Sequence, residues 1–157
     1  KRTLPLFFSA ALDEQGLSRP GTVIKVAMPK HSDPSSAEHI WVTPFAMLSD
    51  GRITGFLDND PQDLGDLRYG DQVTFTTEMI SDWSLLSDRG LAYGQFTTRV
   101  IFEDGAFGDT PFEQLFEADP VPGDLRPAFG ERRFFFEEEL EAMFDERTDG
   151  RTSRAFQ

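Results

Sequence analysis

The first apolar residues of the chain recur with helical spacing, three and four positions apart. Thr3 precedes them where an N-cap residue stands, and Gly16 follows them where a helix commonly ends. The pattern therefore predicts one amphipathic helix at the start of the chain. Its apolar face comprises Leu4, Phe7, Phe8, Ala11 and Leu12.

The pattern then changes to the alternation of β-strands. Strands are predicted over residues 22–29, 40–48, 52–60, 72–77 and 91–102. Asp50 and Gly51 tolerate positive φ, so they predict a tight hairpin turn between the second and third strands. Residues 1–101 are thus predicted to form an α+β domain, with an N-terminal helix and a strongly bent antiparallel sheet of about five strands.

The remainder, residues 102–157, is predicted to be an acidic, Phe-rich extension with two helical segments that packs on this domain. The stretch TPFEQLFE, residues 110–117, begins with Thr110 as N-cap, Pro111 at the first helical position and Glu113 at the third, which predicts a short helix. The stretch FFFEEELEAMFDER, residues 134–147, has helical spacing, and a mobile tail is expected from about residue 148. Its apolar side comprises Phe136, Leu140, Met143 and Phe144.

The chain carries a net charge of −13. A surface of this sign repels nucleic-acid phosphates and anionic lipids and attracts cationic partners, so neither nucleic acid nor membrane is expected as a partner. The chain has no cysteine, which removes disulfides and thiolate chemistry and suits the cytoplasm. No phosphate-binding loop or GxSxG sequence occurs, and we expect no cofactor.

Several short motifs occur in one order: VIKVAMP, EHIWV, GRITGFLDNDP, GDQVTF, ISDW and YGQFTTR. In this order and spacing, residues 3–101 resemble the YegJ-like bacterial family called domain of unknown function 2314. The resemblance implies a fold rather than a reaction. Members of this kind occur beside secreted bacterial toxins, so the resemblance also implies an immunity role by association.

The motifs contain one alternative site, a small-ligand or catalytic pocket formed by His39, Trp41, Asp58 and Trp83. We favour the structural interpretation of each residue. His39 is expected to bond to a turn or to Asp58, the DNDP sequence to form a turn rather than a metal site, and both tryptophans to lie in the core. In that interpretation Asp82 caps the turn that follows it.

The preferred hypothesis is a non-enzymatic binding protein. Carboxylates of the last predicted helix, with the acidic run from Glu103 to Asp124, would capture a basic protein partner, most plausibly a secreted bacterial toxin whose active site they cover. The helix residues predicted to bind the partner are Glu137, Glu138, Glu139, Glu141, Asp145 and Glu146.

Overall fold

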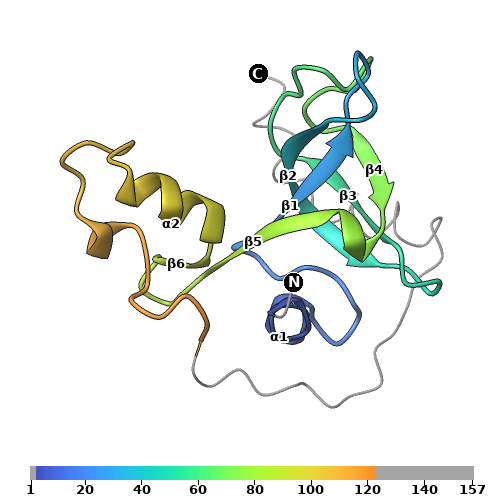
Figure 1. Ribbon diagram of the computed structural model, residues 1–157. Coiled ribbons are helices and arrows are strands. Elements are labelled where there is room, and N and C mark those ends of the chain that lie inside the picture. Colours follow the sequence, from blue (N-terminus) through green and yellow to red (C-terminus); the bar gives the residue numbers. More distant parts are fainter. Residues whose placement is uncertain (1–2, 123–157) are drawn as a thin grey trace, which may run out of the picture.

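The computed structural model describes residues 3–122, which form an α+β unit with one antiparallel sheet of six strands in the order β4-β3-β2-β1-β5-β6 (Figure 1). The elements are α1 (Leu4–Ala11), β1 (Thr22–Pro29), β2 (Ala37–Met47), β3 (Ile53–Leu57), β4 (Gln72–Phe75), η1 (Thr77–Met79), β5 (Ile80–Leu86), β6 (Ala92–Gly94), α2 (Phe96–Glu103) and η2 (Phe112–Gln114).

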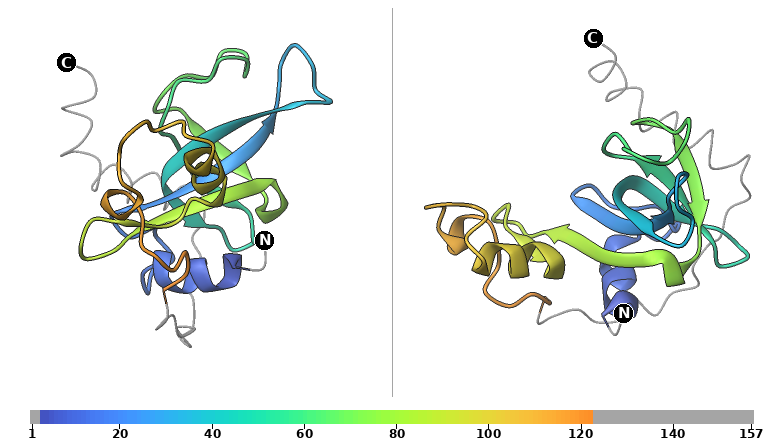
Figure 2. Two further views of the ribbon diagram at one scale, coloured as in Figure 1. Left: turned by 60° about the vertical axis from the view of Figure 1, so that its left-hand side comes forward. Right: turned by 45° about the horizontal axis from the view of Figure 1, so that its top comes forward.

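The sheet must curl, because β4 and β5 are joined by a short connection although three strands lie between them in the sheet. Four strand spacings on a flat sheet would separate them by about 19 Å. The five steps from Phe75 to Ile80 reach at most about 18 Å, and the 3-10 turn η1 shortens that reach. Figure 2 shows the resulting curvature, with β4 and the start of β5 closing toward each other.

The core lies on one face of this curled sheet and is covered by α1. Phe7 of α1 is fully buried and stacks on the indole of Trp83, with ring centroids 4.9 Å apart. Ile24 pairs with both Val42 and Trp83, so these three side chains share the core face. The alternate residues of the same strands point to the opposite, outer face of the sheet.

The predicted α+β class and N-terminal helix are confirmed, whereas the strand count and the ends of several elements differ. Asp50 and Gly51 do form the turn between β2 and β3, with Gly51 at φ 85°. The helix α1 ends at Ala11 with Leu12 rather than Gly16 as its C-cap, and the hydroxyl of Thr3 accepts the indole N–H of Trp83 instead of capping the helix.

The predicted last strand is wrong beyond residue 94. The strand β6 stops at Gly94, and residues Phe96–Glu103 form the helix α2. Gly94 and Gln95 have φ of 71° and 50°, a left-handed pair that turns the chain out of the sheet. The additional strand is β5, Ile80–Leu86, where only isolated core residues and a turn were expected.

The described part of the extension folds back on β6. Phe116 is buried and forms a bridge to Ala92, and the only helical turn in residues 104–122 is the 3-10 turn η2, with Pro111 at its N-cap and no side-chain cap bond. The predicted capping box is therefore not formed. The second predicted C-terminal helix and the tail lie outside the described residues.

Candidate functional site

The outer face of the sheet carries a polar cluster contributed by separate sequence motifs. Strand register places Lys25 between Trp41 of β2 and Asp82 of β5. The Lys25 ammonium lies 4.5 Å from the centroid of the Trp41 ring and donates to the hydroxyl of Thr97 at 3.0 Å. Trp41 is only half-buried, so the prediction that it packs in the core is wrong.

His39 lies on the same face and bonds Ser81 across the small side chain of Ala27, with Nδ1 2.9 Å from Oγ. The Ser81 hydroxyl donates to the carbonyl of Lys25 at 3.2 Å, so in this arrangement it accepts from the imidazole. A serine nucleophile needs the opposite polarity, with the imidazole accepting the hydroxyl proton. Glu38 cannot orient the ring, because its carboxylate accepts the N–H groups of two loop residues.

The DNDP stretch holds the end of β3 in place. Asn59 accepts the backbone N–H of Trp41 at 2.9 Å, and Asp60 accepts the N–H of Tyr69 at 3.0 Å. Asp58 is exposed, and its own N–H donates to the carbonyl of Trp41. These bonds give Asn59 and Asp60 the turn-forming role expected from the sequence.

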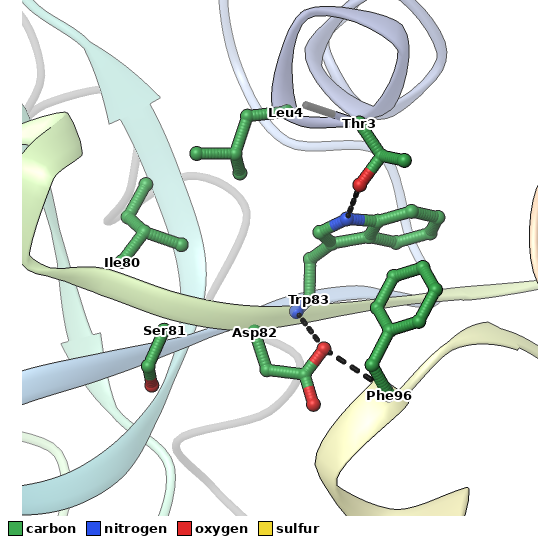
Figure 3. A pocket seen from close by; sticks show the side chains of 7 residues that line it. All are labelled: Thr3, Leu4, Ile80, Ser81, Asp82, Trp83 and Phe96. Atoms are coloured by element: carbon green, nitrogen blue, oxygen red, sulfur yellow. Dashed lines mark hydrogen bonds between the residues drawn. The ribbon is translucent and has the colours of Figure 1, made fainter. Parts of the chain in front are cut away.

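Trp83 does not share a surface with the other three residues of the alternative pocket. It lies on the core face, 2% exposed, whereas His39 and Trp41 lie on the outer face. A small pocket opens between the start of α1, β5 and Phe96, and Trp83 lines it (Figure 3). Its volume of about 30 Å³ has room for about two water molecules, whereas metabolite pockets have roughly 300 Å³ or more.

Asp82 connects the sheet to α2. Its carboxylate is 3% exposed and accepts the backbone N–H groups of Phe96 at 3.1 Å and Thr97 at 2.8 Å, together with the Thr97 hydroxyl at 2.6 Å. Asp82 therefore caps a helix fourteen residues further along the chain rather than the turn that follows it. Carboxylates are favourable at a helix N-terminus because its unpaired N–H groups carry partial positive charge.

Arg99 links α2 to β6 and to the returning segment at Glu117. Its guanidinium donates to three backbone carbonyls, those of Gly94 at 2.7 Å, Ala92 at 2.9 Å and Glu117 at 3.0 Å. It also lies over the Phe116 ring, 4.9 Å from the centroid. Burial lowers the pKa of Arg99, against the opposing charges of Asp119 and Asp82. Sequence reasoning did not find Arg99, Lys25 or Thr97, because their roles depend on strand register and on the return of residues 112–117 to β6.

Residues 92–119, which we call the α2 lobe, extend away from the rest of the sheet (Figures 1 and 2). Their surface combines exposed apolar and acidic side chains. Val100 is 60% exposed, Ile101 49% and Phe96 37%. Residues 102–122 contain six acidic residues and no basic one. Glu117 pairs with Arg89, which lowers the pKa of Glu117, while five are exposed: Glu103, Asp104, Asp109, Glu113 and Asp119.

Comparison with known proteins places this fold in one family. The model of a family described as "uncharacterized protein conserved in bacteria (DUF2314)" matches residues 1–108, more than two thirds of the chain. The chain belongs to the DUF2314 family. No curated protein and no solved structure matches it.

The DUF2314 match includes the outer-face cluster, Asp82 and the whole of α2, and it ends at Gly108 within the α2 lobe. Within residues 3–122, no helix is long and apolar enough to cross a membrane. In the same part of the chain, no three His, Asp or Glu side chains are placed to hold a metal ion. The carboxylates predicted to bind a partner, Glu137 to Glu146, lie outside the described residues.

Proposed function

We propose that this chain is a non-enzymatic bacterial binding protein that captures a basic protein partner through the acidic α2 lobe. The single observation that supports this function is the charge of the lobe. Residues 92–119 contain six acidic residues and one basic residue, Arg99, whose guanidinium donates to three backbone carbonyls, and the lobe stands out from the sheet where a partner can reach it.

The charge imbalance extends over the described chain. Residues 3–122 contain 7 basic and 19 acidic residues, a net charge of 7 − 19 = −12. Opposite charges across an interface raise the rate of diffusional encounter and exclude partners of like charge. A field of this sign therefore favours a cationic protein and disfavours nucleic acid.

The most plausible partner class is a toxin that acts on nucleic acid, with the chain serving as its cytoplasmic immunity protein. An active site that binds phosphate is positively charged, and an acidic surface can occupy it in place of the substrate. The family resemblance implies this role only by association with secreted toxins. Glu137, Glu138, Glu139, Glu141, Asp145 and Glu146 remain predicted contacts with the same partner.

The alternative function, a small-ligand site near His39 and Trp41, has less support. The Lys25 ammonium already lies on the Trp41 ring, and the imidazole of His39 is directed to Ser81. The pocket beside Trp83 is too small for a metabolite. Lys25 links the sheet to α2 through its bond to Thr97, and His39 bonds within the sheet.

The test is association with the purified product of the neighbouring gene, measured by biolayer interferometry at about 50 and about 300 mM NaCl. We expect the association rate to fall at least about tenfold at the higher salt. The double variant Glu103→Lys and Asp104→Lys should slow association, as should reversal of Glu137 to Glu139. The matched double variant Glu14→Lys and Asp66→Lys, which changes the net charge equally at exposed positions outside the lobe, should have a smaller effect.

The proposal fails if association is equally fast at both salt concentrations. It also fails if the two double variants slow association to the same extent, because the effect would then come from net charge alone.

A further inference from the structure

We infer that the α2 lobe docks an amphipathic segment of the partner, with apolar side chains that meet α2 and Lys or Arg side chains around them. The inference rests on the proposed function and specifies the partner's chemistry from an independent observation, the exposed apolar side chains of α2.

These side chains lie on one side of the helix, where the exposed Thr97 falls between Val100 and Ile101 and where Phe96 also contacts the Trp83 ring edge-on. At about 100° per residue, Phe96, Val100 and Ile101 fall within an arc of about 140°. Phe102 lies outside this arc and packs against Phe112 and Phe116, with centroids 5.5 and 5.8 Å away. The helix therefore packs one side against residues 112–116 and leaves Val100 and Ile101 on another side exposed to solvent. Large exposed apolar side chains that lie close together on a surface are typical of an interaction site.

Carboxylates border the exposed face. Glu103 is the last residue of α2 and Asp104 is its C-cap, and neither end residue is balanced by a basic residue in the last turn. Negative charge is locally unfavourable at this end of a helix, because the unpaired carbonyls there carry partial negative charge. A cationic partner removes that disadvantage when it binds.

Charge also decides which occupant fits the apolar face. A second copy of the chain would bring the same carboxylates against this border. The chain's own Phe-rich stretch with its flanks, residues 132–147, contains six acidic residues and three basic ones. A second copy is repelled, and the chain's own stretch brings more carboxylates than cations, whereas a partner segment with apolar side chains bordered only by Lys or Arg is attracted by the carboxylates around α2, as in ordinary protein interfaces.

The test uses the full chain and two synthetic peptides of identical composition. One is a Leu–Lys peptide with all Leu on one helical face, and the other is its scrambled form without an apolar face. We expect fluorescence anisotropy to show at least about tenfold tighter binding of the amphipathic peptide. The double variant Val100→Gln and Ile101→Gln should abolish this preference, and Tyr69→Gln, which changes an exposed apolar residue elsewhere, should retain it.

Equal, salt-dependent binding of both peptides would overturn the apolar docking while leaving the acidic binding function intact. A preference that survives in Val100→Gln and Ile101→Gln would also overturn it. Concentration-dependent self-association that this double variant abolishes would show that a second copy occupies the face. A gain in peptide affinity on substituting Phe136 and Phe144 by Gln would show that the chain's own C-terminal stretch covers it, and either result refutes the inference.

Discussion

Replacing Asp82 tests whether a single buried carboxylate fixes the start of α2. The variant Asp82→Ala removes the acceptor for two backbone N–H groups of α2 and for the Thr97 hydroxyl. Loss of a helix cap costs about 0.5–2 kcal/mol, and a lost bond to a charged group about 1.5–3 kcal/mol. Phe96 and Thr97 are exposed, so water replaces part of the loss. We expect Asp82→Ala to lower the free energy of unfolding by about 2–3 kcal/mol.

The assay is urea unfolding followed by tryptophan fluorescence, since Trp83 lies in the core beside Asp82. Asp82→Asn keeps one carboxamide oxygen as an acceptor and should cost about half as much, roughly 1–1.5 kcal/mol. Asp88→Ala removes an exposed carboxylate from a turn and should stay within about 0.5 kcal/mol of the parent chain.

The test is whether the loss in free energy of unfolding decreases from Asp82→Ala to Asp82→Asn to Asp88→Ala. If Asp82→Ala and Asp88→Ala unfold at the same urea concentration, the carboxylate does not stabilise α2 and the reasoning is refuted. Hydrogen exchange locates the effect: the amides of Phe96 and Thr97 should lose protection in Asp82→Ala, while the amides of β2 and β3 should keep theirs.

Three further outcomes are expected. Gly94→Ala should cost at least about 3 kcal/mol in the free energy of unfolding by urea, because an added Cβ would overlap the backbone carbonyl oxygen of Trp83, whereas Gly70→Ala, at a similar positive φ with open space, should cost about 1 kcal/mol. The hydrogen bond from Arg89 lowers the pKa of Glu117, so this pair stabilises the fold above the ordinary pKa of Glu and the contribution is lost as pH falls; Glu117→Gln should show a flatter acid limb in pH-dependent thermal unfolding, and an unchanged limb would contradict this. Arg99→Lys keeps the charge, but a lysine cannot bond the three carbonyls in a plane as the Arg99 guanidinium does. Hydrogen exchange of the amides in residues 114–117 should therefore accelerate, and unchanged protection would show that these three bonds are not needed.

The strands with unbroken local signals could be predicted from the sequence. The stretch TVIKVAMP gave β1 with its observed bounds, and the Asp50-Gly51 turn fixed the hairpin of β2 and β3. In both cases residues next to one another in sequence determine the structure. The alternation of β5 is less regular, because Ser81 and Asp82 are two consecutive polar residues at the point where its pairing with β1 shifts register. Its pattern therefore resembled isolated core residues rather than a strand.

The helix α2 could not be predicted, because its cause is not local. The residues FTTRVIFE are mostly β-branched or aromatic, which favours a strand. The helix starts where the carboxylate of Asp82, distant in sequence, accepts the first backbone N–H groups of the helix, and where Gln95 takes a left-handed conformation. The same limit applied to the outer-face cluster: His39 and Trp41 could be placed on one strand, but their partners Ser81 and Lys25 required the register of three strands.

The helix α2 combines two features that are each unfavourable for its stability: exposed apolar side chains, and carboxylates at its C-terminal end. An apolar arc exposed to water forgoes the gain that burial would give, about 1.5–3 kcal/mol for each large side chain. Carboxylates at the C-terminal end cost about 0.3–1 kcal/mol each against the helix dipole. Solubility alone would explain the carboxylates but not the exposed apolar side chains. Core packing alone would bury those apolar side chains. A partner that is both basic and apolar offsets both disadvantages together, which is why α2, rather than the polar outer face of the sheet, is the surface on which the binding function should be tested.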